Sequence, residues 1–126
     1  MRSQSGNRVV HLELRTGNLA CACAVYSGLL GWEVETVHAG DASYVTLAPG
    51  GPIETGVVED DTERGFWLPY VEVADVAALT GRAEELGLRV LLAPREGPTG
   101  WRSVIASPTA GVVALWQPKC RAPHRR

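Results

Sequence analysis

Polar and apolar residues alternate along the stretch HLELRTGN, which begins at His11. A period of two is typical of a half-buried strand, so Leu12 and Leu14 are expected to face a core. His11, Glu13 and Arg15 then share the opposite face. The default interpretation of such a face is a solvated sheet surface, and the alternative is a site that another part of the chain covers.

The pattern that follows this strand has a helical period. Asn18 is suited to cap a helix over residues 19–30, where apolar residues recur every three to four positions, and Gly31 is suited to end it. Three strands are predicted next, EVETVH, SYVTLA and IETGVVE, the first two joined by a Gly-Asp turn in AGDAS. The first half therefore reads strand, helix and three strands.

The second half repeats this order after the polar, turn-rich segment DDTERG. LPYVEVA is predicted as a strand, Asp75 as the cap of a helix that Gly87 ends, and LRVLLA, WRSVIA and GVVALWQ as strands. The expected boundaries are a first module at 8–60, a linker at 61–65, a second module at 66–118 and a flexible tail at 119–126. Because each module leaves an apolar sheet face that the other can cover, the two are expected to form one domain with a cleft.

Composition and charge narrow the class of protein. A chain of 126 residues with 45% hydrophobic residues suits one domain with its own core. The net charge of -2 provides no general attraction to nucleic acid or to membrane lipid. The start MRSQSGNR lacks the apolar run of a signal peptide, and Cys21, Cys23 and Cys120 lack the spacing of a metal site. A reduced, cytoplasmic protein is the expectation.

Three segments carry a resemblance to a known family: VYSGLLGW at 25–32, WLPYVEVADV at 67–76 and SPTAGVVALWQP at 107–118. In this order they resemble the vicinal oxygen chelate superfamily, which includes glyoxalase I, bleomycin-resistance and fosfomycin-resistance proteins, and extradiol dioxygenases. In the last segment Ser107 stands where the family usually has Asp, and the Gly is displaced to Gly111. The resemblance implies an α+β fold in which two β-α-β-β-β modules form a cleft-bearing, half-barrel mixed sheet, usually in a homodimer.

The resemblance also implies where a metal would lie. In metal-dependent members, His and Glu residues at equivalent places on the first and last strands of each module hold a divalent ion. His11 lies as far before the cap Asn18 as Leu68 lies before the cap Asp75. The repeat therefore predicts that Leu68 is the counterpart of His11.

The last strands can be aligned by their shared sequence GVV, which places Glu59 opposite Ala114. Leu68 and Ala114 have no lone pair to donate to a cation, so two of the four expected ligand positions are apolar. The expectation is that no catalytic metal is present, and that His11 and Glu59 would be the ligands if one were bound.

His11, Glu13 and Glu59 are the candidate catalytic side chains. His11 would act as a general base or hydrogen-bond donor in the cleft, with Glu59 or Glu13 orienting its other nitrogen. The alternative is a histidine that is hydrogen-bonded within the sheet. Arg15 and Glu72 fall opposite each other in the two first strands and are expected to form a structural ion pair.

A second group of residues is predicted to line a ligand site. Most are aromatic, because flat rings bury large areas at little entropic cost. Trp101 follows Gly100 in GPTGWRS and is predicted to fold over a bound molecule as a lid, with packing in a core or dimer contact as the alternative for the tryptophans. The candidate ligand-binding residues are Tyr44, Trp67, Leu68, Tyr70, Trp101, Ala114 and Trp116.

Two classes of function remain open, and whether the protein is an enzyme is not decided. The first is a bleomycin-resistance-like module that binds a small aromatic or polycyclic metabolite without a metal, for sequestration or antibiotic resistance. The second is a metal-independent isomerase, lyase or cyclase of specialised metabolism that uses His11 as acid or base. A metal-dependent lyase or dioxygenase is a less favoured alternative. A further reading is an interaction domain with an empty cleft, which predicts no small-molecule binding. The expected partners are a small molecule and a second copy of the chain, with no nucleic acid and no membrane.

Overall fold

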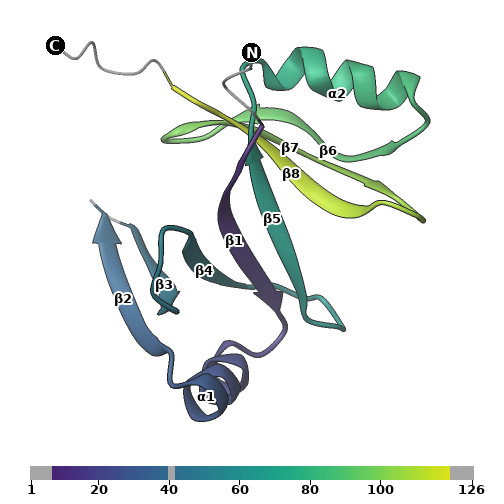
Figure 1. Cartoon of the computed structure of the whole chain (residues 1–126). Coiled ribbons are helices and arrows are strands. Elements are labelled where there is room, and N and C mark those ends of the chain that lie inside the picture. Colours follow the sequence, from purple (N-terminus) through teal and green to yellow (C-terminus); the bar gives the residue numbers. More distant parts are fainter. Residues whose placement is uncertain (1–6, 40–41, 120–126) are drawn as a thin grey trace, which may run out of the picture. The chain divides into compact units, whose positions relative to one another are not determined.

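The computed structural model describes residues 7–39 and 42–119, so the predicted Gly-Asp turn, Cys120 and residues 120–126 of the tail lie outside the described residues. The elements follow the predicted order, strand, helix and three strands, twice (Figure 1). They are β1 (Val9–Thr16), α1 (Leu19–Leu30), β2 (Glu33–Ala39), β3 (Ala42–Ala48), β4 (Glu54–Glu59), β5 (Phe66–Glu72), α2 (Val76–Glu85), β6 (Arg89–Glu96), β7 (Gly100–Ser107) and β8 (Gly111–Pro118). The predicted α+β class is confirmed.

The chain divides into two compact units. We call residues 10–69 the N-terminal unit, and residues 70–119 together with residues 7–9 the C-terminal unit. The predicted linker coincides with the loop between β4 and β5. The division itself falls later, inside β5, after Pro69.

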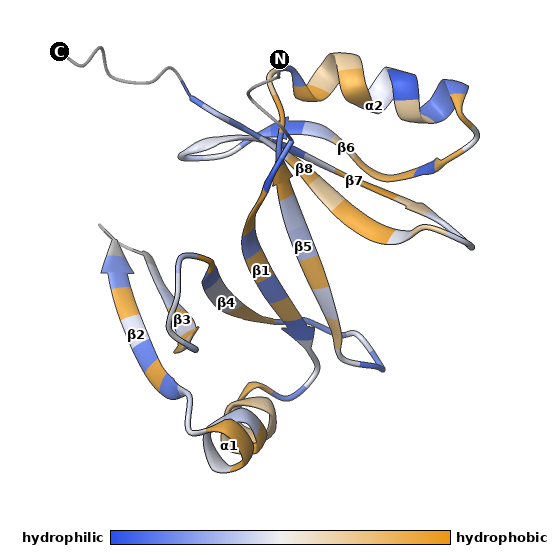
Figure 2. Ribbon diagram, viewed as in Figure 1, coloured by the Kyte–Doolittle hydropathy of each residue, from blue (hydrophilic) through white to orange (hydrophobic). Residues whose placement is uncertain are grey.

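In the N-terminal unit, the strands lie in the order β2-β3-β4-β1, with β1 parallel to β4 and the other neighbours antiparallel. Hydrophobic and hydrophilic residues alternate along β1 and β2 (Figure 2). One face of this sheet packs against α1 through a core that contains Leu14, Cys23, Leu47 and Val57. Burial of this core stabilises the unit by removing apolar surface from water.

In the C-terminal unit, the order is β5-β8-β7-β6, with β5 parallel to β8 and the other neighbours antiparallel. The core beneath α2 contains Val73, Val76, Ala83, Ile105 and Leu115. The pairing of β6 with β7 shifts its register twice between Val90 and Arg95. Each shift is a β-bulge or similar irregularity, and such features redirect the side chains that follow them.

Both helices begin at the predicted caps. The side chain of Asn18 accepts a hydrogen bond of 2.9 Å from the Cys21 N–H, and that of Asp75 accepts one of 3.0 Å from the Ala78 N–H. Each satisfies one of the free N–H groups of a first helical turn. Gly31 ends α1 in the left-handed conformation, with φ of 73°. No helix in the described part of the chain has the length and apolar character needed to span a membrane.

The two units also reveal which residues of the last strands are equivalent. Glu13 pairs with Gly56, and Tyr70, the counterpart of Glu13, pairs with Ala114. Gly56 is therefore the counterpart of Ala114. The predicted alignment, which placed Glu59 opposite Ala114, is wrong.

Hydrogen bonds at the two helix starts support the corrected alignment. Glu59 accepts a hydrogen bond of 2.9 Å from the N–H of Leu19, the first residue of α1. Gln117 accepts one of the same length from the N–H of Val76, the first residue of α2. Glu59 and Gln117 therefore occupy equivalent positions in the two units, and each accepts a hydrogen bond from the first N–H of a helix. The GVV match failed because it is short and common in a Val-rich chain, whereas register is set by pairing with a distant strand.

Candidate functional site

His11, Glu13 and Arg15 lie on the face of the N-terminal sheet opposite α1. This follows from the strand period, because Leu14 belongs to the core beneath the helix. Only 8% of Glu13 is exposed, and His11 and Arg15 are half-buried. The part of this face around Glu13 is therefore not open to solvent, whereas Glu54 on β4 and Tyr44 on β3 are exposed.

Arg15 connects two acidic groups of this face. Its Nη1 lies 2.8 Å from Glu13 Oε1, and its Nε and Nη2 lie 3.1 and 3.0 Å from Asp60 Oδ2. Burial disfavours the charged guanidinium, but its hydrogen bonds and charge interactions with Glu13 and Asp60 prevail and raise the pKa of Arg15. Glu13 is thus engaged with a cation of its own strand. The predicted Arg15–Glu72 pair stays a prediction.

His11 lies beside Gly56 of β4. A Cβ atom on Gly56 would lie 3.4 Å from Nε2 and Cε1 of the imidazole, at the short end of ordinary van der Waals contact, so the ring packs over this position. Burial lowers the pKa of His11, and this effect exceeds the opposing influence of the Glu13 and Glu54 carboxylates. A neutral imidazole at neutral pH can accept a proton, and the two carboxylates would stabilise the imidazolium that forms.

Glu54 was not among the predicted site residues. It is the direct register partner of His11 across β1 and β4. The sequence did contain a signal for it, because Glu54 and Gly56 alternate with buried Thr55 and Val57 in IETGVVE. Period two on β4 places Glu54 on the same face as His11.

Glu59 lies at the other end of the same strand pair. Thr16 pairs with Glu59, whereas His11 pairs with Glu54, five residues earlier on each strand. At about 3.3 Å per residue the separation of His11 and Glu59 along the strands is about 16 Å. The prediction that Glu59 orients His11, or shares a metal with it, is therefore wrong.

The side chains that could act as metal ligands also test the metal site that the family resemblance implies. Among residues 7–39 and 42–119, no cluster of three His, Cys, Asp or Glu side chains could hold a metal ion. Continuing the β5–β8 register by two residues makes Leu68 and Val112 the counterparts of the His11–Glu54 pair. Neither side chain can bind a cation. The described residues do not fit such a centre, and no chemical step is derived through one.

The environment of His11 predicts a pH dependence of stability. Because burial lowers the pKa of His11 in the folded state below its ordinary value of 6.5, the unfolded chain binds the proton more readily. The free energy of unfolding should therefore fall as the pH drops from about 7 through the lowered pKa. Urea titrations at each pH would measure this slope. His11→Gln should reduce it, and His38→Gln, on exposed β2, should not; equal slopes in both variants would contradict the assignment.

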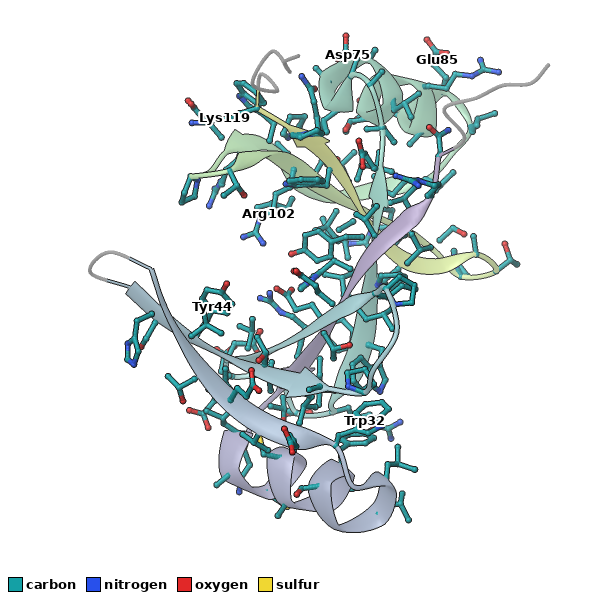
Figure 3. The ribbon with its side chains drawn as sticks, turned by 60° about the vertical axis from the view of Figure 1, so that its left-hand side comes forward. Trp32, Tyr44, Asp75, Glu85, Arg102 and Lys119 are labelled. Atoms are coloured by element: carbon teal, nitrogen blue, oxygen red, sulfur yellow. The ribbon has the colours of Figure 1, made fainter. Side chains whose placement is uncertain are left out.

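The C-terminal unit contains a cavity of about 330 Å³. It is lined by Tyr70, Arg95, Arg102, Trp116 and residues 96–100, which run from the end of β6 to the start of β7. The guanidinium of Arg102 donates a hydrogen bond of 2.9 Å to the Tyr70 hydroxyl. Arg102 extends from the sheet face opposite α2, as Figure 3 shows. The cavity therefore combines two flat rings with two cations on that face.

Gly100 is the residue that lets Trp116 lie against β7. A Cβ atom on Gly100 would lie 2.8 Å from the indole Nε1 and would collide with the backbone carbonyl of Gln117. Real Cβ atoms do not approach so closely, so only glycine allows this contact without a shift of the strands. The Trp116 indole can therefore occupy its position in the cavity only because residue 100 is a glycine.

Three of the predicted ligand-binding residues lie on or next to this cavity. Tyr70 and Trp116 line it, and Ala114 is the register partner of Tyr70 with an exposed fraction of 0%. Leu68 is buried at 3% exposure, and Tyr44 is 51% exposed on β3, on the sheet face opposite α1 (Figure 3). The structure thus gathers Tyr70, Ala114 and Trp116.

Trp67 has a different role from the predicted one. It packs against the core of the N-terminal unit, with its ring edge-on to Tyr26 and Trp32 at centroid distances of 5.4 and 6.4 Å. Its indole Nε1 donates a hydrogen bond of 3.2 Å to the Tyr26 hydroxyl. These contacts satisfy its ring and its polar atom inside the core. The ligand-binding prediction for Trp67 is therefore wrong.

Trp101 is also a packing residue. It lies against the core beneath α2, on the face opposite the neighbouring Arg102. The Lys119 ammonium lies 5.8 Å from the centroid of its ring, within the range of a cation–π contact. The predicted lid is therefore wrong. The adjacent glycines suggested a mobile loop. Side chains along β7 alternate between the two faces of the sheet, however, and this alternation places the Trp101 indole on the face that α2 covers.

Residues 8–113 match the model of one protein family, described as the glyoxalase/bleomycin resistance protein/dioxygenase superfamily. Among curated proteins, the chain is 24% identical over 123 residues to the anthracycline biosynthesis protein DnrV of Streptomyces peucetius, and to the same extent to DauV of Streptomyces sp. strain C5. Each match covers 83% of this chain and 45% of the relative. The chain therefore spans less than half the length of these relatives.

Solved structures share the fold. The hypothetical protein BH1468 of Bacillus halodurans has a TM-score of 0.64 at 13% identity, covering 94% of this chain and 99% of that one. Methylmalonyl-CoA epimerase of Mycobacterium tuberculosis has a TM-score of 0.60 at 19% identity, covering 98% and 94%. Together with the family match over residues 8–113, these findings establish that the chain belongs to the glyoxalase/bleomycin resistance protein/dioxygenase superfamily.

Proposed function

We propose that the cavity of the C-terminal unit binds a small aromatic or polycyclic metabolite. The observation that carries the proposal is the pairing of an indole and a phenol ring, Trp116 and Tyr70, in one cavity of about 330 Å³. Ligand sites of this size range commonly combine flat apolar walls with a few polar groups that fix orientation. Arg102, hydrogen-bonded to Tyr70, is such a group.

The proposed setting is specialised metabolism. Anthracyclines are polycyclic aromatic compounds, and the relatives DnrV and DauV are both named as anthracycline biosynthesis proteins. That similarity supports a ligand with fused rings. The proposed role is capture or sequestration of such a molecule, which requires no bond to be made or broken.

Trp116→Ala should weaken binding at least about tenfold, because it removes a ring surface from the cavity. Trp101→Ala is the matched control, since it removes an identical side chain from the opposite face of the same sheet. That variant should lower the melting temperature and change affinity less than about twofold. Calorimetric titration with 1,4-dihydroxyanthraquinone, a neutral planar probe, would measure both.

Two results would overturn the proposal. One is the absence of any binding by wild-type protein whose circular dichroism shows it folded. The other is an equal loss of affinity in Trp116→Ala and Trp101→Ala, which would trace the effect to lost stability and not to a lost contact.

A metal-independent enzyme is the second candidate function. It is favoured by His11, a half-buried imidazole whose lowered pKa keeps it neutral near Glu13 and Glu54. In this reading His11 removes a proton from carbon or oxygen of a compound bound at the polar face of the N-terminal sheet and returns it at another position, as in an isomerisation. Mass spectrometry of incubated probes, together with exchange of probe hydrogen for deuterium from D₂O, would distinguish turnover from simple capture.

A further inference from the structure

Two arginines lie side by side on neighbouring strands that line the cavity of the C-terminal unit. Arg95 on β6 and Arg102 on β7 are direct partners in the antiparallel register, and both line the cavity. Like charges at directly opposed positions of a sheet repel one another. Their shared register therefore concentrates two positive charges on the strands that line the cavity.

The position of Arg95 depends on an irregularity of β6. The register of β6 against β7 shifts between Leu92 and Arg95, at the point where Pro94 interrupts the strand. Pro has no N–H to give to a ladder, and bulges redirect the side chains that follow. The irregularity thus sets the register in which Arg95 lies opposite Arg102.

None of the ion pairs described for residues 7–39 and 42–119 includes Arg95 or Arg102. Glu96 is the register partner of Trp101, and its carboxylate lies 2.8 Å from the Lys119 ammonium. The Arg102 guanidinium donates to the Tyr70 hydroxyl, a neutral group, and Arg95 forms no ion pair with any residue that the structure describes. The cavity therefore carries an excess of positive charge, although the whole chain has a net charge of -2.

We infer that the ligand of this cavity is an aromatic carboxylate, an inference that rests on the proposed function. The carboxylate accepts hydrogen bonds from the guanidinium groups of Arg95 and Arg102, a geometry that suits two planar groups. The ring system of the ligand lies against Tyr70 and Trp116. Binding relieves the repulsion between the arginines, so a carboxylate is preferred over a neutral compound of the same shape.

Anthraquinone-2-carboxylate and its neutral carboxamide form the test pair. Wild-type protein should bind the carboxylate at least about tenfold more tightly, and this preference should shrink as NaCl is raised. Arg95→Gln should reduce carboxylate affinity about tenfold and leave carboxamide affinity within about twofold. Arg102→Gln, which also removes the hydrogen bond to Tyr70, should weaken carboxylate binding more than carboxamide binding. Arg89→Gln, an exposed arginine of β6 outside the cavity, is the control and should bind as wild type does.

The outcomes separate this inference from the function on which it rests. Equal affinity of wild type for carboxylate and carboxamide would overturn the inference and leave an aromatic site in place. Binding of neither compound, by protein shown to be folded, would overturn the proposed function itself. Inorganic phosphate that competes as strongly as the carboxylate would also overturn the inference, because the rings would then contribute nothing. Since exposed Arg95 has no described ion pair, Arg95→Gln is expected to fold and so keeps the test valid if Arg102→Gln does not.

Discussion

Replacing Gly100 by alanine is expected to lower the free energy of unfolding by about 2–3 kcal/mol, the upper part of the range for overpacked sites. The added Cβ would meet a backbone carbonyl, that of Gln117, and not the end of a flexible side chain. Trp101 and Gln117 are register partners in the β7–β8 ladder, so the strands must separate there or the Trp116 indole must leave its place. Affinity for an aromatic ligand should fall together with stability.

Urea denaturation monitored by tryptophan fluorescence would measure this loss. Gly81→Ala is the control, because no atom lies within 4 Å of the position of its Cβ and Gly81 lies inside α2. That change should stabilise the protein by about 0.5–1 kcal/mol, since alanine favours a helix interior more than glycine does. An unchanged midpoint in Gly100→Ala would show that β7 and β8 adjust without cost.

Arg15→Met is expected to destabilise the protein by about 3 kcal/mol, because it leaves the carboxylate of Glu13 buried without the cation that contacts it. Glu13 is 8% exposed, so water cannot fully replace the lost partner. Changing both residues, in Glu13→Gln with Arg15→Met, should recover much of the loss, since a neutral amide costs less to bury than a charge. Thermal and urea unfolding of the two single variants and the double variant would complete this cycle.

The control for Arg15 is an exposed ion pair. Arg82 lies 3.4 Å from Glu85 on α2, where the two side chains are 64% and 70% exposed. Arg82→Met should change the free energy of unfolding by less than about 0.5 kcal/mol. If Arg15→Met lowered the free energy of unfolding as little as Arg82→Met does, the polar face of β1 would have to be hydrated in solution.

The elements that the sequence predicted correctly are those that local signals specify. Asn18 and Asp75 cap helices through hydrogen bonds to residues three positions away, and the period of two in β1 separates Leu14 from His11 without reference to any other strand. The repeated order of elements then followed, and with it the α+β class. These features need no knowledge of which strands pair.

The site was harder to predict because it depends on pairing between distant segments. The register of β1 with β4 brings Glu54 to His11 and takes Glu59 away from it. The face on which Trp67 and Trp101 lie is decided by the helix that covers each sheet, and both indoles fell on the covered side. Tyr70 and Trp116 lie on the other side, where they line the cavity, and their role in ligand binding stays a prediction.

The interrupted strand β6 has a consequence for the behaviour of the protein at high concentration. β6 is the last strand in the order of the C-terminal sheet, so its outer edge has no strand to pair with in the described part of the chain. An unbroken edge of this kind invites strands of other molecules to add to it, which leads to aggregation. Pro94 removes one donor from that edge, and the shifted register disturbs its regular spacing. The irregularity that positions Arg95 therefore also protects the sheet from uncontrolled growth.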